Sequence, residues 1–143
     1  MLNHQWQKFK QQKLSYYSLL ILLAIFAISM LSNFIANDKP LLVKFQDKFY
    51  FPLWQNLPET AFGGSFYTTA NYLDPATQNL IKKQGWLIMP PIPYFFDTLS
   101  LSNPKPAPAK PSSQNWLGTD DWGRDVLSRL LYSTKISLTL LFY

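Results

Sequence analysis

The longest apolar run of the chain covers residues 14–36, where 23 consecutive residues carry no charge. A helix rises about 1.5 Å per residue, so this run would extend roughly 34 Å, enough to cross a hydrocarbon core of about 30 Å. Tyr16 and Tyr17 stand near its start, where aromatic side chains favour the membrane interface. The pattern predicts a transmembrane helix over 14–36 that follows a tail over 1–13.

The polar residues near the end of this run have two interpretations. Ser29, Ser32 and Asn33 either mark a face toward neighbouring helices, because polar groups in lipid seek partners, or are tolerated close to the outer interface. A cleaved signal peptide is disfavoured for two reasons. Its apolar core would be shorter, about 7–15 residues, and Phe34 stands where cleavage needs a small residue.

Beyond residue 36 the apolar positions fall into short runs separated by prolines. All eleven prolines lie between residues 37 and 115, which argues against long helices there. Two apolar arms, 41–45 and 48–51, flank Gln46 and Asp47 and predict a β-hairpin.

One short helix and one more strand are predicted in the same region. Asp74 is a good helix cap, Pro75 suits the first helical position and Gly85 suits the end. Residues 86–89 then form an apolar run that two prolines stop, which predicts a strand. Together these elements predict a small α+β lobe, rich in proline and aromatic residues, over 37–101.

The lobe holds an unusual number of aromatic residues for its size. We expect most of them to form its core, because large apolar groups bury, and the others to face the membrane interface or another subunit. The set is Phe45, Phe49, Tyr50, Phe51, Trp54, Phe62, Phe66, Tyr67, Tyr72, Trp86, Tyr94, Phe95 and Phe96.

Residues 102–115 carry four prolines and no large apolar side chain, which predicts an extended, semi-rigid connector. The following segment, 116–135, begins with glycines and aspartates and continues with apolar residues at helical spacing. This pattern predicts a capped helix along the membrane surface. From residue 136 the chain is apolar or hydroxylated up to Tyr143, as expected for the start of a second, truncated transmembrane helix over 136–143.

Several residues of the final segment have predicted structural roles. Thr119 or Asp120 would cap the helix. Asp125 and Arg129 are four positions apart and would pair on one helix face. The glycines permit turn geometries closed to other residues. The predicted structural motif at the external start of this helix comprises Gly118, Thr119, Asp120, Gly123, Arg124, Asp125 and Arg129.

Composition and charge exclude several classes of function. Charged residues make up only 15% of the chain, below the roughly 25% usual for soluble domains. The net charge of +5 does not indicate nucleic-acid binding, because the excess lies beside apolar segments: three lysines within 1–13, then Arg129 and Lys135. The three lysines place the tail in the cytoplasm and residues 37–125 outside, in the periplasm.

Catalysis, metal binding and cofactor binding are not expected. The chain has no cysteine, and its single histidine, His4, lies in the tail. A hydrolase that uses Asp120 and Asp125 as paired carboxylates is the remaining enzymatic alternative. Capping explains both residues more simply. We therefore expect no catalytic residues, no metal ligands and no cofactor-binding residues.

The run from Leu117 to Leu138, LGTDDWGRDVLSRLLYSTKISL, closely resembles the start of the core of C-type permease subunits in dipeptide and oligopeptide ABC importers. Ser133 stands where that family usually has glycine. Upstream, IANDKPLLVKF, FYFPL and QNWLGTD resemble the subgroup that includes the Yej-type permease, similar to the microcin C and oligopeptide importer subunit. The resemblance extends over nearly the whole chain.

The resemblance implies a multi-pass permease of the bacterial inner membrane, of which this chain would be an N-terminal fragment. It implies a second permease subunit, two ATPase domains bound through later segments, a periplasmic solute-binding protein, a peptide substrate and the lipid bilayer as partners. No nucleic acid is expected. The alternative is a single-pass, membrane-anchored envelope protein with a small external binding lobe.

Overall fold

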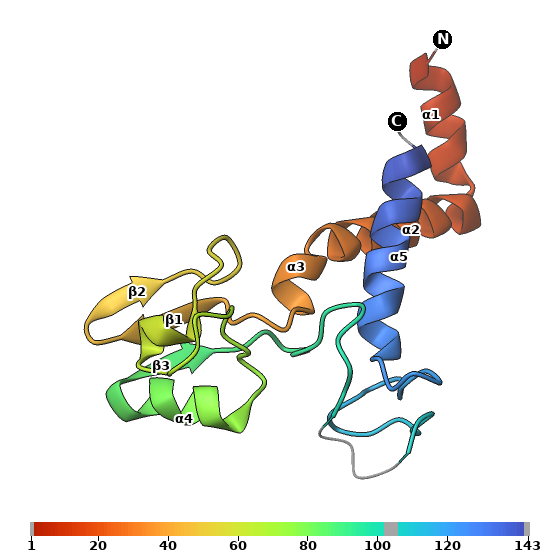
Figure 1. Cartoon of the computed structure of the whole chain (residues 1–143). Helices are drawn as coiled ribbons and strands as arrows, with labels where there is room; N and C mark the ends of the chain where they lie inside the picture. Colours follow the sequence, from red (N-terminus) through yellow and green to blue (C-terminus); the bar gives the residue numbers. More distant parts are fainter. Residues whose placement is uncertain (1, 102–105, 142–143) are drawn as a thin grey trace.

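The computed structural model describes residues 2–101 and 106–141, with side chains from Gln5 onward. Three helices, α1, α2 and α5, gather on one side of the molecule, and a small sheet with helix α4 lies on the other (Figure 1). The short helix α3 leads from α2 toward the sheet. The helical part and the lobe predicted from the apolar pattern are therefore both present.

The predicted membrane span is divided into two helices. Helix α2 covers Lys13–Met30, Leu31 interrupts the regular geometry, and α3 covers Ser32–Ile35. The preceding tail is also helical, since α1 covers Leu2–Gln11. Among the described residues one helix, α2, is long and apolar enough to cross a membrane, judged by length and composition alone. Its placement in a membrane remains a prediction.

The lobe contains a three-stranded antiparallel sheet in the order β2-β1-β3. Strand β1 covers Leu42–Phe45, β2 covers Lys48–Tyr50 and β3 covers Gly85–Ile88. Gln46 and Asp47 connect β1 to β2 with positive φ angles of 48° and 60°, the geometry that two-residue hairpin turns favour. The predicted hairpin is confirmed.

Helix α4 covers Pro75–Gln84, and the carboxylate of Asp74 caps it by accepting a 3.1 Å hydrogen bond from the Ala76 N–H. The predicted cap and first proline are thus confirmed, and β3 follows directly at Gly85. One face of the sheet packs on α4 and on the 3-10 helix η1, Glu59–Phe62. This core consists of Val43, Phe45, Phe62, Ala70, Tyr72 and Ile81.

The expectation that most lobe aromatics form the core is wrong. Four of the thirteen are buried, namely Phe45, Phe62, Tyr72 and Tyr94. Seven are exposed: Phe49, Phe51, Trp54, Phe66, Tyr67, Trp86 and Phe96. The physical reason is geometric, because a three-stranded sheet covered on one face by a short helix encloses too little volume for thirteen large rings.

A second apolar cluster joins the lobe to the helices. It consists of Ala36, Ile92, Tyr94 and Tyr132, with partly buried neighbours from α3 and α5 around it. Backbone hydrogen bonds fix the segment around Ile92 beside the end of α3: Ile92 N–H to the Ile35 carbonyl at 3.0 Å and Asn37 N–H to the Ile92 carbonyl at 3.1 Å. The start of α5 is therefore held against both the lobe and the end of α3.

Candidate functional site at the start of helix α5

Helix α5 covers Val126–Leu141, so it begins ten residues later than the predicted helix over 116–135. Its cap is Asp125, whose Oδ1 accepts a hydrogen bond from the Ser128 N–H at 2.8 Å. The expectation that Thr119 or Asp120 would cap the helix is wrong. Residues 116–125 form tight turns, because Gly118 and Gly123 both adopt φ of +79°.

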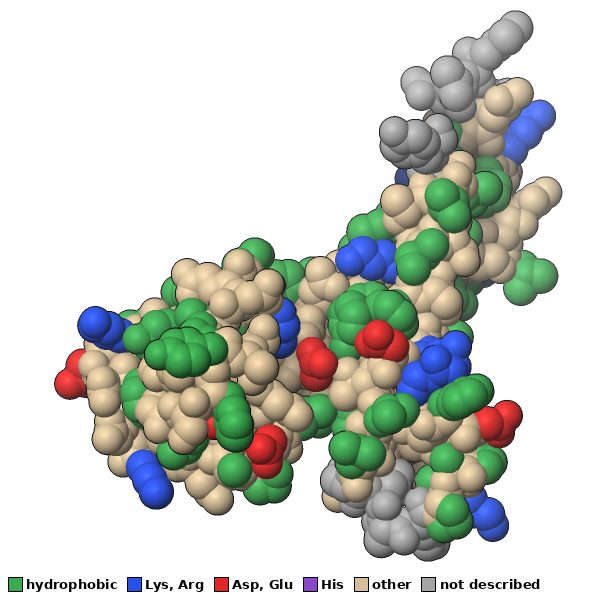
Figure 2. Space-filling model, viewed as in Figure 1, with side chains coloured by type: hydrophobic (Ala, Val, Ile, Leu, Met, Phe, Trp, Pro, Cys, Tyr) green, Lys and Arg blue, Asp and Glu red, His purple; other side chains and the backbone are tan. Residues whose placement is uncertain are grey.

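Asp120 organises the turn before the helix. Its Oδ1 accepts from the backbone N–H groups of Trp122 at 3.0 Å and Arg124 at 2.9 Å. Its Oδ2 accepts from the Arg124 Nε at 2.9 Å and from the Arg129 guanidinium. One carboxylate thus binds two arginines and two backbone amides. Figure 2 shows acidic and basic side chains close together around the start of α5.

The environment of Asp120 determines its charge. Burial by itself raises the pKa of the carboxyl, but the hydrogen bonds from Arg124 and Trp122 and the positive charge of Arg124 outweigh burial, so the pKa is lowered from its ordinary 3.8. Asp120 is therefore a carboxylate at neutral pH.

The predicted pair between Asp125 and Arg129 does not form. Arg129 binds Asp120, whereas the Asp125 side chain is turned inward, with 1% of the residue exposed. Its Oδ2 accepts from the Asn115 Nδ2 at 2.9 Å, and Asn115 Oδ1 in turn accepts from the Ser100 hydroxyl at 3.1 Å. This buried chain of hydrogen bonds connects the end of the lobe to the connector and to α5.

Asn115 is the functional candidate that the sequence reasoning missed. It is fully buried, and its own N–H donates to the Ser112 hydroxyl at 3.1 Å. The available signal was an Asn placed immediately before the Trp-Leu-Gly turn, but nothing in its local sequence shows that it would meet Ser100 and Asp125.

The connector folds back on the turn. Thr119 forms two hydrogen bonds with Ala109: its N–H donates to the Ala109 carbonyl at 3.0 Å and its hydroxyl accepts from the Ala109 N–H at 2.8 Å. Residues 106–115 of the predicted connector are therefore tied to the turn at Gly118, and their extended, semi-rigid character stays a prediction. Residues 102–105 of that connector lie outside the described residues.

The structure thus brings most of the predicted motif together, though with partners that differ from the predicted ones. Asp120, Arg124 and Arg129 form an ion-pair cluster, while Thr119 and Asp125 bind segments that precede them in the chain. No group of three or more metal-ligating side chains occurs within residues 2–101 and 106–141. The ionised groups are engaged by protein partners, so the geometry favours a structural junction.

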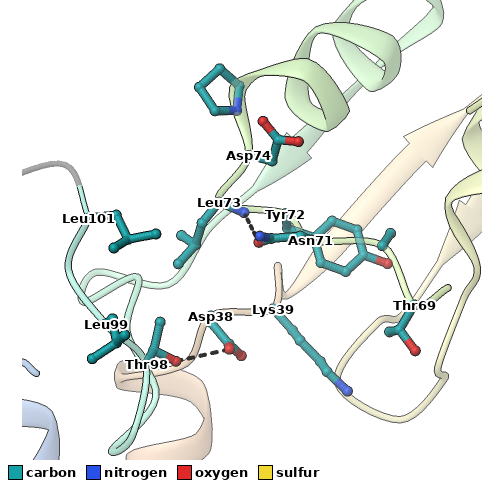
Figure 3. Close-up of a pocket in the computed structure, with 12 residues that line it drawn as sticks. Asp38, Lys39, Thr69, Asn71, Tyr72, Leu73, Asp74, Thr98, Leu99 and Leu101 are labelled. Carbon is teal, nitrogen blue, oxygen red and sulfur yellow. Dashed lines mark hydrogen bonds between the residues drawn. The ribbon is translucent and has the colours of Figure 1, made fainter. Parts of the chain in front are cut away.

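A pocket of about 810 Å³ lies beside this junction, between the lobe and the segment that leads to the connector. Figure 3 shows the Asp38 carboxylate directed at the Thr98 hydroxyl, 3.0 Å away, with Leu73, Leu99 and Leu101 on the same side. Tyr72 also lines the pocket, and burial raises the pKa of its phenol to about 12. Asp38, Asp74 and Asn71 each have protein partners, whereas the buried Tyr72 hydroxyl has no hydrogen-bond partner among the described residues.

By sequence, the chain is homologous to permease proteins of ABC transporters. The inner membrane ABC transporter permease protein YejE of Escherichia coli (strain K12) is 43% identical over 134 residues, which is 94% of this chain and 39% of that protein. The peptidoglycan transport system permease protein YejE of Agrobacterium fabrum (strain C58 / ATCC 33970) is 33% identical over 158 residues, which is 94% of this chain and 41% of that protein.

Two shorter similarities point to the same family. The dipeptide transport system permease protein DppC of Alkalihalophilus pseudofirmus is 40% identical over 42 residues, 29% of this chain and 14% of that protein. The nickel transport system permease protein NikC of Escherichia coli (strain K12) is 57% identical over 28 residues, 20% of this chain and 10% of that protein. No family model and no solved structure matches. The resemblance to permeases is thereby confirmed, and the chain is an inner-membrane protein.

Proposed function

We propose that this chain forms the first membrane helix, the periplasmic lobe and the start of the second membrane helix of a permease subunit in an ABC importer for peptides. The observation that carries the proposal is the similarity to two YejE permeases over 94% of the chain. The chain spans about two fifths of the length of those relatives, so transport would depend on segments of the subunit that are not present here.

The substrate class follows from the chemistry that the relatives' names share. One name refers to peptidoglycan and another to dipeptides, and both materials contain short peptides. The nickel permease matches over 28 residues only and gives weaker support for a metal substrate. These names support oligopeptides as the proposed substrates, and the proposal of microcin C-type peptides among them rests only on the resemblance of the upstream segments to the Yej-type subgroup.

The proposed partners are those of an ABC importer: a second permease subunit, two ATPase domains, a periplasmic solute-binding protein and the surrounding lipid. The lysines of residues 1–13 support a cytoplasmic N-terminus, and residues 37–125 would then face the periplasm. In this arrangement the ion-pair cluster of Asp120 and the buried chain through Asn115 fix the external end of α5 against the lobe. ATP would be hydrolysed by the separate ATPase domains.

The proposal is tested by disrupting the gene in its host and measuring uptake of a radiolabelled tripeptide and of a free amino acid. Loss of tripeptide uptake alone supports a peptide importer, whereas unchanged tripeptide uptake rejects it. Complementation then uses the wild-type gene, an Asp125→Ala variant and an Asp121→Asn variant. Asp121 is exposed, so its variant should restore uptake, while removal of the buried Asp125 carboxylate should not.

A further inference from the structure

An exposed aromatic patch lies where the lobe meets the end of the apolar helices. It consists of Phe34 on α3 and of Phe51 and Trp54 on the turn that follows β2. The Phe34 and Trp54 rings meet edge to face with centroids 6.0 Å apart, and the Phe51 and Trp54 centroids are 6.2 Å apart. Phe34 and Phe51 are nearly half exposed, and Trp54 is 69% exposed.

The turn that carries this patch is held in one conformation. The N–H groups of Trp54 and Gln55 both donate to the Phe51 carbonyl at 3.1 Å, and Pro52 is fully buried beneath them. A rigid turn with a buried proline directs Phe51 and Trp54 outward. The small core of the lobe explains why single rings are exposed, but a contiguous and rigidly held aromatic patch marks a contact with another phase or molecule.

The position of Phe34 identifies what covers the patch. Helix α2 has 18 residues, so it extends about 27 Å, close to the thickness of the hydrocarbon core. The segment after Met30 would then enter the outer interfacial layer, which tryptophan prefers. Phe34 lies four residues beyond Met30, and its contact brings Trp54 to the same depth.

We infer that the lobe rests on the outer leaflet through Phe34, Phe51 and Trp54, with Trp54 inserted at the boundary between lipid headgroups and acyl chains. The patch continues the lipid-facing surface of α2 through Leu31, which is 53% exposed. Lys39 lies at its edge, where its Nζ donates to Asn56 Oδ1 at 2.7 Å, and a lysine there suits the phosphate level of the bilayer. This inference concerns the lobe's contact with lipid and does not depend on the transported substrate.

The test uses two single-tryptophan proteins, one that keeps Trp54 and one that keeps Trp86, with the other four tryptophans replaced by phenylalanine. Trp86 is the matched control, because it is 43% exposed on the sheet and its ring pairs with Phe49. The replaced tryptophans, Trp6, Trp116 and Trp122 among them, are exposed, so the fold should tolerate their loss. Both proteins are reconstituted in phosphatidylcholine vesicles that contain brominated lipids.

Trp54 should lose more emission than Trp86, and bromines close to the glycerol backbone should quench it more than bromines near the methyl end of the chain. Equal quenching of the two tryptophans, or quenching of Trp54 by aqueous iodide instead of lipid, would overturn the inference and leave a protein partner or water on the patch. A second measurement uses spin-labelled Trp54→Cys and Trp86→Cys variants, which is practical because the chain has no cysteine. The spin label at position 54 should collide with oxygen more often, and with a water-soluble nickel chelate less often, than the label at position 86. The reverse order of the two collision rates contradicts insertion of Trp54 in the lipid.

Discussion

The hydroxyl of Tyr132 in α5 lies 2.8 Å from the carbonyl oxygen of Ala36, a residue 96 positions earlier in the chain. Both residues are buried, and Asn33 Oδ1 accepts from the same hydroxyl at 3.0 Å. The Phe95 ring packs edge to face on Tyr132 with centroids 4.8 Å apart. This hydrogen bond joins the end of the helices α2 and α3 directly to α5, with no residue of the lobe between the two partners.

Replacing Tyr132 with phenylalanine removes the hydroxyl and keeps the ring. The buried Ala36 carbonyl then loses its partner, which should lower the free energy of unfolding by about 1–3 kcal/mol. The thermal unfolding midpoint in detergent micelles measures the effect. Tyr67→Phe is the control, since Tyr67 is 89% exposed, and it should change stability by less than about 0.5 kcal/mol. Equal effects of the two variants would mean that the hydroxyl of Tyr132 does not stabilise the junction.

The same contact resolves the two interpretations of the polar residues at the end of the first apolar run. Ser29 and Ser32 are buried, and α2 packs against α5. Asn33 bonds to Tyr132 of α5. The structure therefore supports the interpretation that these residues face a neighbouring helix. Small hydroxylated side chains allow such close approach between helices.

Local signals in the sequence were sufficient for the hairpin and for α4. Gln46 and Asp47 form the turn, and Asp74 and Pro75 start the helix, because each of these interactions joins residues a few positions apart. The role of Asp125 could not be predicted in the same way. Its cap to Ser128 is local, but its partner Asn115 is ten positions away across two tight turns, and local spacing favoured Arg129 instead.

The buried chain through Asn115 predicts a specific rescue. Asp125→Ala should destabilise the protein by about 2–4 kcal/mol, because the Ser128 N–H and the Asn115 amide both lose their acceptor. The Asp125→Asn variant keeps the cap to Ser128. Its side-chain NH2 group would then face the NH2 group of Asn115, where neither can accept a hydrogen bond. The double variant Asn115→Asp with Asp125→Asn exchanges the two residues and again gives each hydrogen-bond donor an acceptor. The Ser100 hydroxyl is one of these donors. In a double-mutant cycle, the unfolding midpoint of the exchanged protein should be higher than the two single variants predict by addition. If the losses of the single variants simply add, the pairing of residues 115 and 125 is contradicted.

The two glycines with φ of +79° should respond differently to alanine. A Cβ on Gly123 would meet its nearest atom, in Ala107, at 3.8 Å, so Gly123→Ala should cost only the left-handed backbone strain of about 1–2 kcal/mol. A Cβ on Gly118 would overlap the Ala109 carbonyl and would break the bonds between Ala109 and Thr119. Gly118→Ala should therefore lower the unfolding midpoint clearly more than Gly123→Ala; an equal loss would show that the connector is not held by Thr119.

Asp120 predicts a pH dependence with a defined sign. Because its pKa is lowered in the folded protein, its stabilisation is fully present above the ordinary value of 3.8 and is lost as the pH falls through the lower folded value. The gap in unfolding midpoint between wild type and Asp120→Asn should stay constant from neutral pH to about pH 5 and should narrow below 3.8. Asp121→Asn, at an exposed position, should show no such gap. A gap that widens in acid would contradict a carboxylate held by Arg124.

The proposed orientation in the membrane can be tested with introduced cysteines, because the chain has none. Lys8 on α1 and Lys48 on β2 are both exposed, so Lys8→Cys and Lys48→Cys should leave the fold intact. An impermeant maleimide added to spheroplasts should label position 48 at once and position 8 only after permeabilisation, since basic tails favour the cytoplasm.

A reporter joined after Tyr143 distinguishes the permease from the single-pass alternative. The 16 residues of α5, Val126–Leu141, are fewer than the roughly 20 that a crossing needs, so the reporter is attached through a further apolar linker. Activity specific to the cytoplasm is expected if α5 begins a second crossing. The control is a matched fusion in which Leu130 and Leu138 of α5 are both replaced by aspartate (Leu130→Asp and Leu138→Asp), while Arg129 and Lys135 are kept. The two aspartates should block the crossing, so the reporter should then lie in the periplasm. If both fusions report from the periplasm, α5 lies on the membrane surface and the single-pass arrangement holds.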